Sequence, residues 1–280
     1  MRERSSAEGS SNENEVRVVG MSRSGNHAIL YWIIAQAEGR LAFLNCVEPK
    51  ANPFATARPL WAGRPAIASY PEFDRSREAA GRLSSKRWLI YNYEDAFLGK
   101  VASPVFEARR ERWVGRSESR RDVLIIRDPF NLFASRRKAG FYRGSDRAPP
   151  GMVSEATALR IWKQHAREAL GLRSHLDDPL VIRYNAWASD RDYRRTIAER
   201  LGLPFDDGPS RRVPPTAGGS SFDGTSACGA AHRMAVAARW RYYAGDPSFR
   251  TLFDEDAVEL SRALFGEIPG TRELMLRESA

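Results

Sequence analysis

Short apolar runs separated by longer amphipathic stretches form the main pattern of this chain. Each run is too short for a helix and is typical of a strand that is buried on both faces. The runs that we expect to be strands are residues 16–21, 41–46, 88–93, 122–127 and 179–184. Stretches with helical spacing separate them, as at residues 28–37. This alternation predicts an α/β fold, a three-layer sandwich around a mostly parallel, five-stranded sheet.

The ends and the composition of the chain indicate how it is organised. Residues 1–15 are polar, charged and rich in serine, which predicts a disordered tail and not a signal peptide. Residues 16–280 are expected to form a single domain, because 280 residues with 42% hydrophobic content can bury a large core.

No stretch approaches the roughly 18 apolar residues of a membrane span. The only cysteines, Cys46 and Cys228, form neither a disulfide framework nor a cysteine-spaced zinc site, and a cytoplasmic location is expected.

The first predicted strand runs into a loop bracketed by Gly20 and Gly25, and an apolar helix follows directly. Loop amides and the N-terminus of a helix together favour a bound anion, and glycines let the chain turn tightly around it. The GxxxxG spacing is that of a Walker A loop, but Asn26 and His27 replace its Lys and its Ser or Thr. We expect phosphate binding without a metal, through Ser22, Arg23, Ser24, Gly25, Asn26 and His27.

The loop lacks the Ser or Thr hydroxyl of a Walker A motif, and this absence bears on which group the protein could transfer. Transfer of a phosphoryl group from ATP relies on Mg²⁺, which a Walker A hydroxyl binds, so its loss argues against a kinase. Transfer of a sulfuryl group builds less charge, and cations with N–H donors are sufficient. Arg23 would be such a cation. A strand-to-helix turn without any ligand is the alternative interpretation of this segment.

A second segment adds another candidate phosphate site. The apolar strand at residues 122–127 ends in Arg127, and a helix is expected to begin at Pro129, a residue suited to the first helical turn. Arginine offers a planar fork to phosphate oxygens, and Ser135 adds a neutral donor from the helix. Alternatively, Arg127 pairs with Asp128 or another acid.

Both segments resemble those of sulfotransferases that use 3′-phosphoadenylyl sulfate (PAPS). Their loop commonly reads Pro-Arg-Ser-Gly-Thr-Thr or Pro-Lys-Ser-Gly-Thr, and this chain has Arg-Ser-Gly at residues 23–25 but departs at Asn26 and His27. The resemblance implies that the loop binds the 5′-phosphosulfate, that Arg127 and Ser135 bind the 3′-phosphate, and that 3′-phosphoadenosine 5′-phosphate (PAP) is the product.

A weaker similarity lies late in the chain. Residues 218–224 resemble the Gly- and Ser-rich loop that closes over the nucleotide in these enzymes, which implies that Gly219 and Ser220 contact the donor. A plain linker is the alternative interpretation, since small polar loops are common.

Sulfuryl transfer also needs a group that removes the proton of the acceptor. The carboxyl ends of parallel strands meet at one edge of a sheet, and Glu48 follows the predicted strand 41–46 at that edge. Some sulfotransferases place a catalytic Glu at a comparable point. Glu48 is therefore our first choice for the base, with Glu94 and Asp95 in reserve and His27 as a further possibility.

The acceptor is expected to be a small molecule or carbohydrate with a hydroxyl or amine. Residues 47–87, including Phe54 and Phe73, and also Phe141, would line its pocket or form a satellite core.

The net charge of +9 would attract the anionic donor. Interleaved acidic residues argue against nucleic-acid binding. A P-loop kinase using ATP and Mg²⁺ and a non-catalytic nucleotide-binding protein remain alternative functions.

Overall fold

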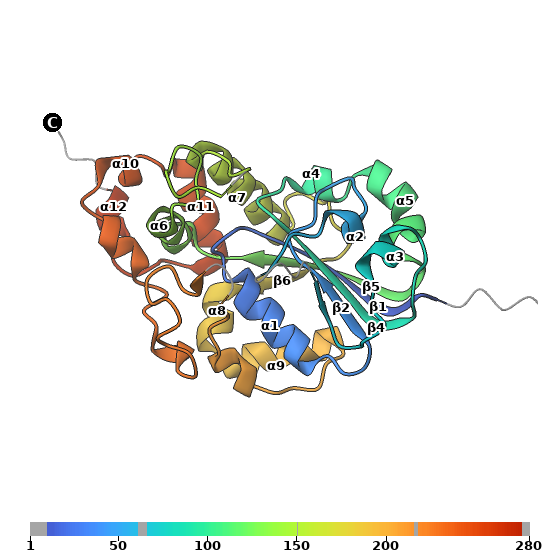
Figure 1. Cartoon of the computed structure of the whole chain (residues 1–280). Coiled ribbons are helices and arrows are strands. Elements are labelled where there is room, and N and C mark those ends of the chain that lie inside the picture. The colour runs from blue at the N-terminus through green and yellow to red at the C-terminus, as the bar shows by residue number, and fades with distance from the viewer. Residues whose placement is uncertain (1–9, 61–65, 150, 216–217, 276–280) are drawn as a thin grey trace, which may run out of the picture.

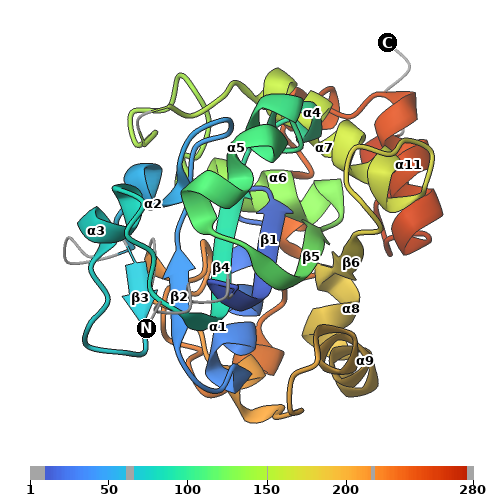
Figure 2. The same ribbon diagram turned by 90° about the vertical axis from the view of Figure 1, so that its right-hand side faces the viewer.

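The computed structural model describes residues 10–60, 66–149, 151–215 and 218–275. In this part of the chain, six strands form one sheet in the order β3-β2-β4-β1-β5-β6 (Figure 2). All neighbouring strands are parallel except β2 and β3. The strands are β1 (Asn12–Gly20), β2 (Leu41–Leu44), β3 (Ala66–Ala68), β4 (Lys86–Glu94), β5 (Ser117–Ile126) and β6 (Leu180–Arg183). The predicted mostly parallel α/β fold is confirmed, with a sixth strand, β3, too short to give a clear apolar run.

The sheet begins earlier than the sequence pattern indicates. Strand β1 starts at Asn12, so residues 12–15, which were assigned to the disordered tail, belong to the centre of the sheet. Glu15 is buried there and accepts hydrogen bonds from the hydroxyls of Tyr91 and Ser117, each at 2.6 Å. Partners from neighbouring strands offset the cost of burying a charge, which polarity along the chain alone does not reveal. Residues 1–9 of the predicted tail lie outside the described residues.

Helices cover both faces of the sheet. Helices α1, α8 and α9 lie on one side, and α4 and α5 lie on the other (Figure 1). Within the described residues, no helix is both long and apolar enough to cross a bilayer. The α-helices are α1 (Asn26–Gln36), α2 (Pro53–Thr56), α3 (Arg75–Ala79), α4 (Leu98–Val101), α5 (Pro104–Val114), α6 (Pro129–Ala139), α7 (Glu155–Ala169), α8 (Tyr184–Ser189), α9 (Arg191–Leu201), α10 (Pro247–Arg250), α11 (Glu255–Phe265) and α12 (Arg272–Met275). The 3₁₀ helices are η1 (Gly208–Arg211), η3 (Ala231–Arg233) and η4 (Arg239–Tyr243).

Alternate strand residues fill two cores, one on each face of the sheet. Val18 packs with α1, α8 and α9, whereas the next residue, Val19, packs against α4 and α5 on the opposite face. A third cluster joins the end of β5 to α6, α7 and α11. The strands are apolar on both faces, as expected for a sheet covered on both sides.

The parallel strands bring their carboxyl ends to one edge. There, Gly20 at the end of β1 pairs in register with Glu94 at the end of β4. Strand β5 ends next to β6, with Ile126 opposite Arg183. Ligands of open parallel sheets bind beyond this edge.

Candidate functional site

The turn between β1 and α1 depends on left-handed backbone conformations. Gly25 has a φ of 93°, and Arg23 also has a positive φ, of 71°. A Cβ atom at Gly25 would lie 2.1 Å from the ring of Tyr184, so a larger residue would collide with it. The first hydrogen bond of the helix joins Ile29 N to Gly25 O. The preceding amides of α1 therefore point out of its N-terminus and favour an anion.

A cavity of about 1040 Å³ lies over this turn, a volume at the upper end of the range of small-molecule sites. Ser24 and Ser135, two residues predicted to bind the donor, are buried and are not among the described residues that line the cavity. The lining includes the other eight: Ser22, Arg23, Gly25, Asn26, His27, Arg127, Gly219 and Ser220.

Two buried arginines converge beside the cavity. Arg127 Nη1 and Arg239 Nη1 each donate to the Ser135 hydroxyl at 3.2 Å. Arg127 also donates to two backbone carbonyls, those of Arg23 and Val236. Burial, together with the charge of Arg239, lowers the pKa of Arg127 to about 10. Arg239 also pairs with Asp223 at 3.2 Å, so the positive charge of Arg127 is the one that a bound anion would offset.

Arg23 adds a third guanidinium and connects two parts of the site. Its Nε donates to the Ser221 hydroxyl at 2.7 Å and its Nη2 to Gly219 O at 2.9 Å. Arg239 binds the same segment through the Ser220 hydroxyl at 2.8 Å. Burial and the nearby Arg239 lower the pKa of Arg23 to about 10. The segment at residues 218–224 is therefore held against the loop by arginines.

Glu94 is the acidic centre of the site. Its carboxylate accepts hydrogen bonds from Ser22 Oγ and Asn26 Nδ2, both at 3.0 Å. His27 Nδ1 lies 3.9 Å from Glu94 Oε1. Burial disfavours the charged carboxylate, but His27 and the hydrogen bonds outweigh it and lower the pKa of Glu94 below its usual value. An ionised carboxylate thus faces the cavity beside the loop.

The structure does not bring Glu48 to this site. Strand β2 ends at Leu44, two residues earlier than expected, and Cys46 then turns the chain with a φ of 45°. This turn buries Val47 and exposes Glu48, which is not among the described residues that line the cavity. Glu94, the reserve candidate for the base, lies at the predicted edge and lines the cavity.

Several lining residues were missed or misplaced from the sequence. Arg239 is one, because it lies in an irregular segment far along the chain, and Tyr184 begins α8 instead of ending a strand. Phe141 lines the cavity. Phe54 and Phe73 instead pack together, with ring centroids 6.4 Å apart, within the second sheet core. They form the satellite core that was the alternative interpretation.

Comparisons with known proteins bear on the fold. No protein-family model matches the chain, and no curated protein matches it. Among solved structures, the sulfotransferase domain of the olefin synthase from Synechococcus PCC 7002 is similar, with 15% identity, a TM-score of 0.50, and coverage of 95% of this chain and 99% of that domain. Mouse sulfotransferase SULT7A1, complexed with PAP, shares 17% identity over 70% of this chain and 60% of its own, with a TM-score of 0.41. The arrangement of sheet and helices described above is thus that of a sulfotransferase fold.

Proposed function

We propose that this chain is a sulfotransferase that moves the sulfuryl group of PAPS to a hydroxyl or amine of a small-molecule or carbohydrate acceptor. The observation that carries the proposal is that one cavity holds two adjacent groups of N–H donors and cations, each suited to an anion. The N-terminus of α1 and its loop provide the first site, and Arg127 with Arg239 provides the second. A nucleotide with anionic groups at both the 3′ and the 5′ position of its ribose would fit such a pair of sites. PAPS is such a nucleotide, with a 3′-phosphate and a 5′-phosphosulfate.

The residues around the first site suit in-line transfer. As the acceptor atom bonds to sulfur, the bond between sulfur and the 5′-phosphate oxygen breaks, and PAP leaves with that oxygen. The amides of the loop, together with Arg23, would stabilise the negative charge on the leaving oxygen. Their fixed position costs no rearrangement during the reaction.

Glu94 is the proposed base. Its depressed pKa keeps it ionised at neutral pH, and it faces the cavity beside the loop. It accepts the acceptor proton, which becomes more acidic as the new bond to sulfur forms. Phe141, whose ring lies 5.5 Å from Arg23 Cζ, would border the acceptor. A cytoplasmic location is part of this proposal.

Calorimetric titration with PAP and with AMP tests the donor assignment. Loss of one charge-assisted contact costs about 1.5–3 kcal/mol, so PAP should bind roughly 10- to 100-fold more tightly than AMP. Ser135→Ala and Arg127→Ala should reduce this preference by weakening PAP binding alone. Arg87→Ala, at a half-exposed arginine outside the cavity lining, should retain it. Equal affinity for PAP and AMP, or tighter binding of ATP with Mg²⁺, would overturn the assignment.

Turnover is the second half of the test. Purified protein with PAPS and a panel of phenols, sugars and amines should release PAP and a sulfated product. If PAP binds but no acceptor in a broad panel is sulfated, the non-catalytic alternative would gain support.

A further inference from the structure

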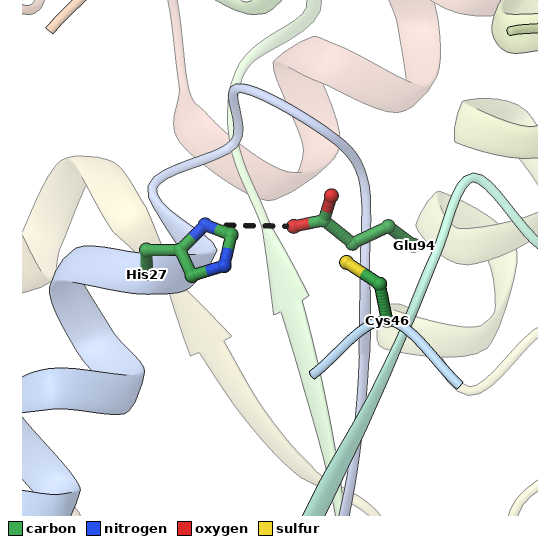
Figure 3. A group of neighbouring side chains, drawn as sticks. All are labelled: His27, Cys46 and Glu94. Atoms are coloured by element: carbon green, nitrogen blue, oxygen red, sulfur yellow. Dashed lines mark ion pairs between the residues drawn. The ribbon is translucent and has the colours of Figure 1, made fainter. Parts of the chain in front are cut away.

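Three potential metal ligands meet beside the proposed donor loop. They are His27 in the first turn of α1, Cys46 after β2, and Glu94 at the end of β4 (Figure 3). One ligand atom from each lies within 4.8 Å of the other two. A tetrahedral zinc ion with bonds of about 2.0–2.3 Å holds its ligand atoms roughly 3.3–3.8 Å apart. Side-chain movements of about 1 Å would therefore close this cluster around an ion.

Buried amides orient two of these ligands. His27 Nε2 lies 2.9 Å from Asn45 Oδ1, so the N–H on Nε2 donates to the amide. When the ring is neutral, its lone pair is then on Nδ1, the nitrogen that faces Glu94. Asn92 Oδ1 accepts from Cys46 N at 2.9 Å, and Asn92 Nδ2 points to the sulfur at 3.9 Å. Outer hydrogen bonds of this kind fix the tautomer and the position of metal ligands.

The third ligand is oriented as well. Ser22 and Asn26 both donate to Glu94 and hold its carboxylate in place. His27 and Glu94 line the cavity, so the side of the cluster that they form is open to a ligand. A thiolate and a carboxylate together would balance the charge of a divalent cation.

We propose that His27, Cys46 and Glu94 bind a divalent ion of the Zn²⁺ type, with a fourth coordination position open to the cavity. Imidazole nitrogen, thiolate sulfur and carboxylate oxygen are the zinc ligands of proteins, and three protein ligands with one open position are typical of accessible sites. Metal binding displaces the proton of the Cys46 thiol. The expectation of a metal-free site, which rested on the loop sequence, did not consider a cluster assembled from three separate elements.

The proposed metal shares Glu94 with the proposed base. A carboxylate bound to zinc is a poorer proton acceptor, so the filled site should inhibit sulfuryl transfer, and chelation should relieve the inhibition. This consequence rests on the proposed function. The site itself does not, and its test therefore uses measurements that need no turnover.

Titration of chelator-treated protein with Co²⁺ provides the main test, because cobalt replaces zinc and gives a thiolate-to-metal absorption band. The wild type should bind one Co²⁺ per chain with this band and lose it when Zn²⁺ is added. Cys46→Ser should abolish the band and weaken Zn²⁺ binding by more than about 100-fold, since changes to outer hydrogen bonds alone cost about 10- to 100-fold. Cys228→Ser removes the other cysteine, which is exposed, and should change neither the absorption band nor the affinity for Zn²⁺.

A second measurement keeps the proposal testable if Cys46→Ser does not fold. In the Cys228→Ser protein, one equivalent of Zn²⁺ should slow alkylation of Cys46 at least tenfold. A band that survives Cys46→Ser, or alkylation that Zn²⁺ does not slow, would overturn the metal site. PAP titration of the same samples separates the two proposals. If the wild type binds Co²⁺ but not PAP, the donor assignment is wrong; if it binds PAP but not Co²⁺, the metal site is wrong.

Discussion

Individual buried charges define this site more clearly than its shape does. Arg23, Arg127 and Arg239 lie close enough to affect one another, and the pKa values of Arg23 and Arg127 are lowered. Burial of like charges destabilises a protein unless an opposite charge enters the site. In contrast, Arg17, on the helix α5 side of the sheet, pairs with Asp122 and Glu107. Of the three cavity arginines, Arg239 pairs with Asp223 at 3.2 Å. Arg23 and Arg127 donate to hydroxyl and carbonyl oxygens, so an anionic ligand would supply the negative charge that these two guanidinium groups face.

Substitution of Glu94 tests the base assignment. Glu94→Gln keeps the size of the side chain but removes its basic lone pair, so the sulfation rate should fall by roughly 10²- to 10⁴-fold. PAP affinity should change little, because the amide can still accept from Ser22. Glu48→Gln is the matched control and should have the wild-type rate. A normal rate in Glu94→Gln measured at saturating donor would contradict the assignment.

A second residue-scale prediction concerns His165, which sequence analysis did not distinguish. Burial lowers the pKa of His165 to about 4. The ring is therefore neutral above that pH, and its Nε2 donates to Ala96 O at 3.0 Å. Between pH 6.5 and 4, the unfolded chain binds a proton that the folded chain does not. The free energy of unfolding should therefore decrease as the pH falls through this range, by about 3 kcal/mol from His165.

Urea unfolding at a series of pH values measures this effect. His165→Gln should remove that part of the pH dependence, whatever its effect on absolute stability. His232→Gln, at an exposed histidine, should retain the wild-type slope. Parallel curves for the wild type and His165→Gln would show that His165 does not titrate as described.

At the scale of elements, contiguous patterns were the most predictable. The loop before α1 and the segment from Arg127 to Ser135 were located correctly because strand, turn and helix signals adjoin in the sequence. Residues that depend on a distant partner were not. Arg239 meets Ser135 across 104 residues, and its own segment has no periodicity to mark it. Glu48 was misplaced because the left-handed turn at Cys46 follows from tertiary contacts and not from local propensity.

The loop glycine offers an element-scale test. Gly25→Ala adds both the strain of a positive φ and a collision with Tyr184, whereas Gly202→Ala, with a φ of 68° and open space around it, adds the strain alone. The strain costs about 1 kcal/mol. Gly25→Ala should be destabilised further and should lose PAP affinity, while Gly202→Ala should bind PAP normally. Denaturant unfolding and calorimetry measure the two effects, and equal behaviour of the two variants would contradict the role given to Gly25.

Across the whole molecule, the cavity is built from segments that are far apart in the sequence. The loop after β1, the end of β5, the segment at residues 218–224 and the segment at residues 231–239 all contribute to its lining. Arginines hold these segments together, mostly through hydrogen bonds to hydroxyls and carbonyls and, from Arg239, also through an ion pair with Asp223. A ligand that replaces these acceptors with phosphate oxygens would connect the same segments through stronger, charge-assisted bonds.

PAP should therefore raise the thermal stability of the whole chain. At 100 times its dissociation constant, a ligand that binds only the folded state stabilises it by about 2.7 kcal/mol, which corresponds to roughly 5 °C in a chain of this size. AMP at the same concentration, with a 10- to 100-fold weaker affinity, should contribute about 0.4–1.4 kcal/mol. Differential scanning fluorimetry compares the two nucleotides. In Ser135→Ala the PAP shift should fall toward the AMP shift, because the hydroxyl between Arg127 and Arg239 is gone; a full PAP shift in that variant would place the 3′-phosphate elsewhere.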